Sequence, residues 1–211
     1  MEKEKYHKDF RELILSEDFK KLMAYYQCAM MEVETKFNVL NEECSLTHER
    51  NPISSIKARI KTAESIFNKL IKLGVEPKVE NIEKTLNDVA GVRVICNFED
   101  DVYMLAQSLL MQDDINLIIK KDYIDAPKPN GYRSLHLIVS VPIFLQYEKR
   151  EMKVEIQIRT LAMDCWATIE HQLRYKKNVN FTDEMSKELL ICAKLGEEMD
   201  KRMESIRKEV F

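Results

Sequence analysis

Polar side chains that could do acid–base chemistry alternate with apolar ones along three predicted strands. The apolar positions are Val92, Val94, Cys96 and Phe98; Leu135, Leu137, Val139 and Val141; and Met152, Val154, Ile156 and Ile158. Because successive side chains of a strand point to opposite faces, the positions between them share one face of the sheet. That face would carry Arg93, Tyr132, Ser134, His136, Lys153, Glu155, Gln157 and Arg159, with Asp88 just before the first strand.

These residue types suit phosphoryl-group transfer. Two carboxylates, Asp88 and Glu155, could bind Mg²⁺ and take a proton from an attacking hydroxyl. Cationic side chains neutralise the transferred phosphates, and an arginine or aromatic plane stacks on a base. An ordinary solvated sheet face remains the alternative, and alternation by itself favours it. The mixture of tyrosine, histidine and two carboxylates is what indicates a site.

A basic stripe is predicted beside this face. The spacing predicts a helix over residues 57–73 that ends near Gly74, and one side of it would carry Lys61, Ser65, Lys69 and Lys72. Such a stripe is either solvated or holds phosphates while the nearby acids hold Mg²⁺. The sequence has no GxxxxGKS or GxGxxG loop, no HExxH and no His-Asp dipeptide, so P-loop, Rossmann and His-Asp phosphohydrolase chemistry are not supported.

The elements that must position these residues form an α+β pattern. Helices are predicted over residues 16–45, 57–73, 101–112, 160–177 and 183–210, with Thr160 and Thr182 as N-caps. Strands are predicted over residues 92–98, 115–124, 132–141 and 152–159. The order predicts a mixed, largely antiparallel sheet with helices grouped at both ends. We expect a helical region over residues 1–50, a core over 51–177 and a C-terminal helix over 178–211.

Composition limits the class of protein. The chain has 211 residues, 45% hydrophobic and 33% charged, which is enough apolar material for a folded core. It has no apolar run long enough for a membrane span and no apolar signal-peptide core. The five cysteines never form a CxxC pair, which favours reduced thiols in the cytoplasm. The net charge of −3 favours a small phosphorylated ligand over a long nucleic acid.

Four blocks of sequence resemble one known family. They are residues 88–93 (DVAGVR), 121–136 (KDYIDAPKPNGYRSLH), 155–160 (EIQIRT) and 166–171 (WATIEH), followed by Tyr175 and Lys176. In this order they resemble the RelA/SpoT-type (p)ppGpp synthetase domain over residues from about 53 to 176. The resemblance implies a nucleotidyltransferase-like synthetase fold. The short chain is similar to the small alarmone synthetases of the RelP and RelQ kind, which implies a synthetase without hydrolase activity.

The resemblance also implies a reaction and the residues that serve it. The family acts as a GTP/GDP diphosphokinase in stringent-response signalling: it transfers the β,γ-pyrophosphate of ATP to the ribose 3′-hydroxyl of GDP or GTP and releases AMP. By position, Asp88 and Glu155 resemble the catalytic Mg²⁺ ligands, and Glu155 the general base. Arg59 and Arg93 resemble the family's contacts to adenine, and Lys61 and Lys69 resemble its contacts to the ATP phosphates. Tyr132 resembles the contact to guanine, and Lys128, His136 and Gln157 resemble other contacts to GDP or GTP.

Several positions keep a structural alternative. Arg59 could be a surface residue after a short strand, and Trp166, Glu170 and His171 could serve packing or orientation. Residues 54–57 (SSIK) and Asp164 depart from the RelQ pattern around its allosteric cleft, which favours the RelP kind.

Partners follow from the last predicted helix. Its seam of Met185, Leu189, Cys192, Met199, Met203, Ile206 and Val210, with Gly196 in one gap, has alternating steps of three and four. The seam packs either on its own domain or on another copy, and the family resemblance implies a homotetramer. The rival functions are a degenerate nucleotide-binding module and an RNA-binding module, and the isoelectric point of about 5.9 counts against RNA as the main ligand.

Overall fold

The computed structural model describes residues 2–47, 50–174 and 181–210. Within these residues the strands are β1 (Ile53–Ile60), β2 (Ala90–Cys96), β3 (Asn116–Asp122), β4 (Leu135–Phe144) and β5 (Lys149–Thr160). The helices are α1 (Glu2–Leu15), α2 (Glu17–Thr47), α3 (Ala63–Lys72), α4 (Val79–Thr85), α5 (Glu99–Leu110), α6 (Leu161–Arg174) and α7 (Asp183–Val210). No helix among the residues described is long and apolar enough to cross a membrane.

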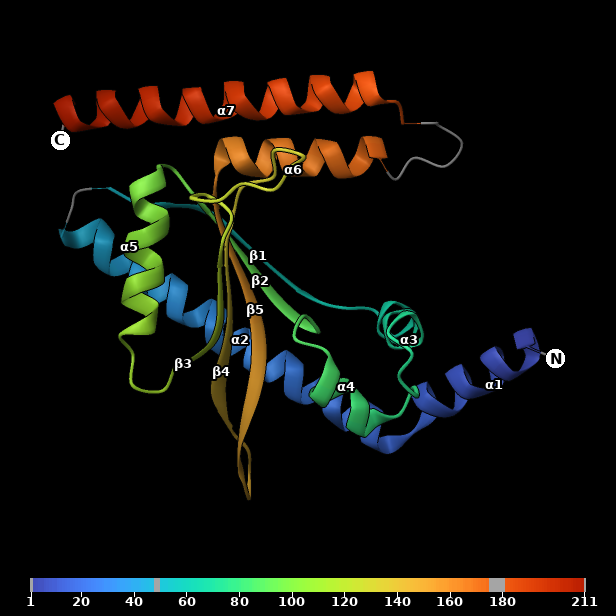
Figure 1. Cartoon of the computed structure of the whole chain (residues 1–211). Helices are drawn as coiled ribbons and strands as arrows, with labels where there is room; N and C mark the ends of the chain where they lie inside the picture. The colour runs from blue at the N-terminus through green and yellow to red at the C-terminus, as the bar shows by residue number, and fades with distance from the viewer. Residues whose placement is uncertain (1, 48–49, 175–180, 211) are drawn as a thin grey trace.

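The strands form one mixed sheet in the order β1-β2-β5-β4-β3. β2 and β5 are parallel, and the other neighbouring pairs are antiparallel. A long connection through α5 and the β3–β4 pair separates the two parallel strands in sequence, so β5 inserts between β2 and β4 (Figure 1). This arrangement confirms the predicted fold class.

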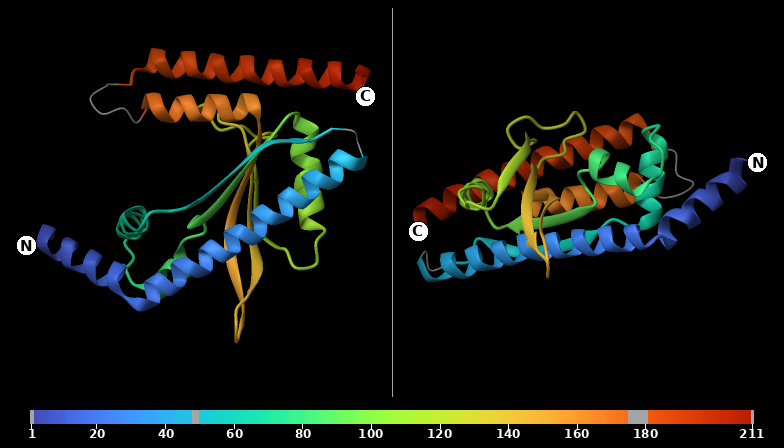
Figure 2. Two further views of the ribbon diagram at one scale, coloured as in Figure 1. Left: turned by 180° about the vertical axis from the view of Figure 1, so that it is seen from behind. Right: turned by 90° about the horizontal axis from the view of Figure 1, so that it is seen from below.

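Helix α2 covers one face of the sheet, as the view from behind in Figure 2 shows. Its buried stripe includes Leu22, Tyr26, Val33 and Phe37, which pack with the buried side chains of the strands. The inward positions predicted by alternation on β4 and β5 are all at most 2% exposed. Period-two alternation therefore identified the core face of these strands correctly.

Helices α6 and α7 lie side by side across one end of the sheet (Figure 1). Thr160 accepts a hydrogen bond from the Met163 amide at 3.2 Å, and Thr182 accepts one from the Met185 amide at 3.2 Å. Both residues are thus N-caps, as predicted. The Trp166 indole donates to the Leu189 carbonyl at 2.7 Å and ties the two helices together.

The predicted helix over residues 57–73 is wrong in its first half. Residues 53–60 form β1, which pairs with β2 almost along its whole length, with Lys57 opposite Arg93 and Arg59 opposite Gly91. The pairing makes residues 57–60 a strand, because strand formation depends on the neighbouring strand. Helix α3 begins only after Thr62, whose hydroxyl accepts from the Ser65 amide at 3.2 Å. Lys61 therefore precedes the helix.

Smaller differences concern other boundaries. The strand predicted over residues 132–141 begins at Leu135, so Tyr132 and Ser134 lie in an extended segment before β4. Helix α1 lies within the helical region expected over residues 1–50 but was not predicted as a separate helix, and α4 was not predicted. The helix predicted over residues 160–177 is described as far as Arg174, and Tyr175 and Lys176 lie outside the described residues. The division into regions 1–50, 51–177 and 178–211 stays a prediction.

Two valines of α2 give a matched test of this core. Val33 is fully buried, whereas Val39 is 61% exposed. We expect Val33→Ala to lower the free energy of unfolding by about 2 kcal/mol more than Val39→Ala, because two buried methyl groups are lost and a cavity is left. Urea denaturation followed by circular dichroism measures both. Equal losses in the two variants would contradict the packing of α2 described here.

Candidate active site

A row of polar side chains crosses three neighbouring strands. Arg93 of β2 lies opposite Gln157 of β5 in the sheet register, and Gln157 lies opposite His136 of β4. Glu155 is two residues before Gln157 and therefore lies on the same face. The apolar residues between them pack in the core with α2. The predicted polar face is thus the face of the sheet turned away from α2.

These side chains form a closed network. Gln157 Nε2 donates to Glu155 Oε2 at 3.2 Å, and Arg159 Nη2 donates to Gln157 Oε1 at 2.5 Å. Arg159 also donates to the Tyr132 hydroxyl at 3.4 Å, which lies 2.8 Å from His136 Nε2. His136 Nδ1 in turn lies 3.6 Å from Glu155 Oε1. Each side chain is therefore held from two sides, which fixes the orientation of the Glu155 carboxylate.

The network sets the charge of its members. Burial acts to raise the pKa of Glu155, but the hydrogen bond and charge of His136 outweigh it, and the pKa lies below its ordinary value. Glu155 is therefore ionised at neutral pH and able to accept a proton or hold a cation. Burial raises the pKa of Tyr132, so its hydroxyl stays protonated. Burial also lowers the pKa of Arg159, which is only 2% exposed.

Asp88 is held by two lysines. Lys61 Nζ and Lys69 Nζ lie 2.5 Å and 2.6 Å from the same oxygen, Asp88 Oδ2. Burial acts to raise the pKa of Asp88, but the two lysines outweigh it and the pKa is lowered. The two lysines predicted as one helical stripe thus meet at Asp88 although only Lys69 belongs to α3. Lys72, the last residue of α3, is exposed.

The residues around Asp88 fit a divalent cation. Asp88 Oδ1 is buried and has no hydrogen-bond partner, so one carboxylate oxygen is left to bind an ion. Asp88 and Glu155 line the same cavity of about 320 Å³. No group of three or more His, Cys, Asp or Glu side chains that could hold a metal occurs among the described residues. Two carboxylates suit Mg²⁺, because this ion usually keeps several waters and binds substrate phosphates.

Two cavities meet at Glu155, which lines both of them. The first, of about 570 Å³, is also lined by Arg59, Arg93, Tyr132 and Gln157. The second, of about 320 Å³, is also lined by Lys69, Asp88, Lys128 and His136. With Lys61 paired to Asp88, the structure brings all the predicted site residues together. Their individual roles stay predictions.

Arg59 and Arg93 come from adjacent strands. Arg59 pairs with Gly91, where a Cβ atom would lie 3.9 Å from Arg59 Cγ, and Arg93 follows two residues later on the same face. Arg59 lies within β1 and not after a strand, and its side chain is exposed. Two guanidinium groups arranged in this way can lie on either side of a planar base.

Aromatic rings form the wall around Lys128. Its ammonium group lies 4.5 Å from the ring centre of Tyr123 and 4.8 Å from that of Tyr132. Both tyrosine rings pack edge-on against His136, with ring centres 5.3 Å and 5.8 Å from it. The role of Tyr123 was not predicted from the sequence. The sequence signal that could have indicated a role for Tyr123 is its position among charged residues in the block 121–136.

Arg159 and Asp164 are the other residues that sequence reasoning left without a role. Asp164 Oδ1 lies 3.5 Å from both Arg93 Nη1 and Arg159 Nη1, and Asp164 Oδ2 lies 3.2 Å from Lys57 Nζ. One buried carboxylate thus faces three cations, which leaves the pocket with excess positive charge. Alternation placed Arg159 on the polar face, but only the position of α6 brings Asp164 to it.

Three positions with a structural alternative are placed as follows. Trp166 is 9% exposed and donates to α7, which supports packing. Glu170 pairs with Arg174 at 2.6 Å. Glu170 and His171 also line the cavity of Arg59 and Arg93.

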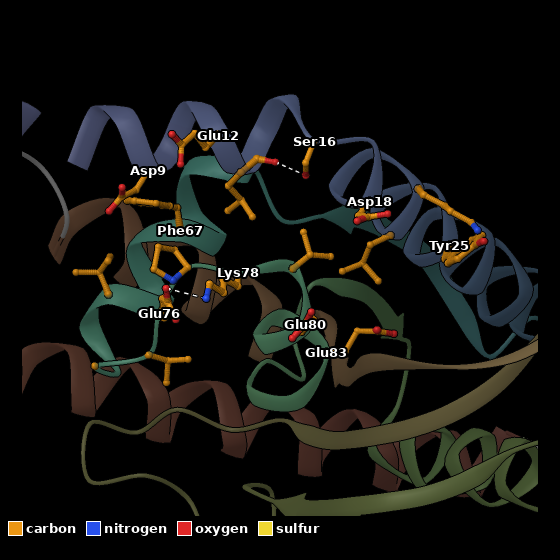
Figure 3. Close-up of a pocket in the computed structure, with 18 of the residues that line it drawn as sticks. Asp9, Glu12, Ser16, Asp18, Tyr25, Phe67, Glu76, Lys78, Glu80 and Glu83 are labelled. Atoms are coloured by element: carbon orange, nitrogen blue, oxygen red, sulfur yellow. Dashed lines mark hydrogen bonds and ion pairs between the residues drawn. The ribbon is translucent and has the colours of Figure 1, made fainter. Parts of the chain in front are cut away.

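A separate cavity of about 1120 Å³ lies between α1, α2, α3 and α4 (Figure 3). Its lining combines acidic side chains such as Asp9, Glu76 and Glu83 with apolar ones such as Phe67. It includes none of the predicted site residues. The cavities at Glu155 are therefore the ones that correspond to the predicted chemistry.

Comparison with known proteins finds relatives along almost the whole chain. Residues 58–180 match the family described as "Region found in RelA / SpoT proteins". GTP pyrophosphokinase YwaC of Bacillus subtilis is 42% identical over 92% of this chain and 92% of its own length. GTP pyrophosphokinase YjbM of the same organism is 33% identical over 91% of this chain and 90% of its own length.

Solved structures show the same fold. The crystal structure of small alarmone synthetase 2 from B. subtilis has a TM-score of 0.82 and 40% identity, over 92% of this chain and 100% of that one. Small alarmone synthetase 1 from B. subtilis, bound to its product pppGpp, has a TM-score of 0.82 and 32% identity, over 92% and 99% of the two chains. The chain therefore belongs to the RelA/SpoT family of GTP pyrophosphokinases.

Proposed function

We propose that the two cavities at Glu155 together bind ATP and one acceptor nucleotide, GDP or GTP. The β,γ-pyrophosphate of ATP is then transferred to the ribose 3′-hydroxyl of the acceptor. The observation that carries this proposal is the position of Glu155. This ionised carboxylate lies where two cation-lined cavities meet. The kinship to GTP pyrophosphokinases, and to a synthetase solved with pppGpp bound, supports the same reaction.

In this reaction the 3′-oxygen of the acceptor attacks the β-phosphorus of ATP. A bond forms between them, and the bond from the β-phosphorus to the α,β-bridging oxygen breaks, so that AMP leaves. The hydroxyl proton passes to the Glu155 carboxylate, which acts as general base. Gln157 and His136 contact this carboxylate and orient it toward the place where the two cavities meet.

The donor residues would be Arg59, Arg93, Lys61 and Lys69. The two arginines would stack on adenine, because they lie on adjacent strands and face the same cavity. Both lysines surround Asp88 and would neutralise the phosphates. Asp88 and Glu155 would hold Mg²⁺, which supplies charge neutralisation for the transferred group.

The acceptor residues would be Tyr132, Lys128, His136 and Gln157. Tyr132 offers a ring for guanine to stack on. Lys128 and His136 line the cavity with Asp88, where they would contact the acceptor phosphates. Gln157 lies between Tyr132 and the Glu155 carboxylate. Arg159 donates a hydrogen bond that fixes the side-chain amide of Gln157.

We further propose that the protein assembles as a homotetramer through its terminal helices and acts in the cytoplasm. Most of the predicted seam of α7 is exposed, with Met199 48%, Met203 52%, Ile206 57% and Val210 67% exposed. An apolar stripe of this length on a helix indicates a contact with another chain. The Leu189 carbonyl accepts from Trp166 of the chain's own α6, and Gly196 lies next to Ala162 of the same helix. The five free cysteines support a reducing compartment.

Glu155→Gln tests the reaction directly. We expect the substitution to lower the rate of pppGpp or ppGpp formation by about 10²–10⁴-fold, because the general base is lost while the shape of the side chain is kept. Anion-exchange chromatography of ATP, GDP or GTP, and Mg²⁺ mixtures measures product and AMP. Glu151→Gln, on the same strand but paired with Lys149, is the matched control and should keep wild-type activity. A folded wild-type protein without product would favour a degenerate nucleotide-binding module.

His136→Gln tests the electrostatics of Glu155. His136 lowers the pKa of Glu155. Loss of the imidazole should therefore raise that pKa, so that the Glu155 carboxylate is protonated up to a higher pH. The acid limb of kcat/KM should therefore move to higher pH. A pH–rate profile of the variant and wild type measures the shift. A lower rate with an unmoved acid limb would contradict this coupling.

Met199→Glu tests the assembly. A charge in the exposed seam should reduce the tetramer to smaller species, because it would be buried without a partner. Light scattering coupled to size-exclusion chromatography gives the mass. Lys194→Glu, an exposed charged position of the same helix, is the control and should leave the mass unchanged. A monomeric wild-type protein would refute the tetramer.

A further inference from the structure

The segment that carries the acceptor residues is held from behind by α7. This segment, residues 128–134, is called the acceptor loop below. Its front presents Lys128 and Tyr132 to the cavities at Glu155. Its back lies against α6 and α7, where the loop after β3 meets these helices in Figure 1.

Gly131 marks the closest approach. A Cβ atom at this position would lie 2.5 Å from Ala193 Cβ and 3.2 Å from Leu190 Cδ1, both on α7. The φ angle of Gly131 is +91°, which also disfavours any other residue. The turn closes on itself, since the Gly131 amide donates to the Lys128 carbonyl at 2.8 Å. The backbone next to Tyr132 therefore rests directly on the surface of α7.

Arg133 forms a second attachment. Its guanidinium is 7% exposed and lies 2.8 Å from Glu99 Oε2 of α5 and 3.8 Å from Asp200 Oδ2 of α7. Asp200 also accepts from the Thr160 hydroxyl at 2.8 Å. The residue directly after Tyr132 thus lies between two helices, with the buried carboxylate of Asp200 on one side and the half-buried carboxylate of Glu99 on the other.

The contact surface is closely packed. Gly131, Arg133, Trp166, Ala193 and Asp200 border a remaining cavity of only about 10 Å³, which is at the lower limit for one water molecule. A larger side chain on the inner face of α7 can fit here only if the acceptor loop moves. The outer face of α7 is not involved in this contact.

From these contacts we propose that Ala193 and Asp200 of α7 are positioning residues for the acceptor nucleotide, acting through the acceptor loop. This inference rests on the proposed function, because it assigns the acceptor to Lys128 and Tyr132. Neither α7 residue lines the cavities at Glu155. A disturbed α7 contact should therefore weaken the acceptor and leave ATP binding unchanged.

Ala193→Val is the first test. The added methyl groups should push on Gly131 and raise the KM for GDP and GTP by about tenfold or more, because small displacements of a binding group are costly. The KM for ATP should stay within about twofold of wild type. Ser205→Val, at an exposed position of the same helix, is the control and should change neither KM. Circular dichroism and size-exclusion chromatography check that fold and assembly are kept.

Asp200→Asn is an independent test that adds no volume. It removes the charge facing Arg133 and should also raise the acceptor KM selectively. A purely structural role would lower the active fraction, and hence kcat, without separating the two KM values. An unchanged acceptor KM in both folded variants, or an equal rise in both KM values, would overturn the proposal. If Ala193→Val fails to fold, Asp200→Asn decides alone. An inactive wild-type protein would instead refute the proposed function.

Discussion

The parallel pairing of β2 with β5 is the constraint on which the site depends. Parallel strands cannot be joined by a tight turn, so the chain must travel through α5, β3 and β4 before β5 returns beside β2. This path brings the sequence around Asp88 and Arg93 next to Glu155 and Gln157. A shift of one residue in the register would turn Glu155 toward the core and Ile156 toward the nucleotides. The buried apolar sets of both strands prevent that shift.

Charge is the second determinant of the site. Each carboxylate at the site has basic partners: Asp88 has two lysines, Glu155 has the His136 imidazole, and Asp164 faces two arginines and a lysine. The protein as a whole has a net charge of −3, but this region has more cations than carboxylates. An excess of fixed positive charge in a partly buried pocket favours polyphosphates. The pocket is thus a local basic region on a mildly acidic protein.

The sequence predicted the parts of this architecture that rest on period-two alternation. Alternation on β4 and β5 distinguished the core from the polar face, and the two threonine caps located α6 and α7. β1 was missed because its second half was included in the helix predicted over residues 57–73, and only pairing with β2 decides between strand and helix there. The network of Arg159 and Asp164 depends on how α6 packs against the sheet, which no local pattern encodes. The roles assigned by family resemblance stay predictions.

The packing of Gly131 on Ala193 also bears on how the chain becomes an enzyme during its synthesis. Every described strand, together with Asp88 and Glu155, is complete by residue 160, so the sheet can form while α7 is still inside the ribosome. The acceptor loop, by contrast, lacks its contacts with α7 until residues 193–200 have emerged. If α7 positions this loop, a nascent chain can complete the part of the site that binds ATP well before the part that binds GDP or GTP. The order of synthesis then delays pyrophosphate transfer until α7 has docked.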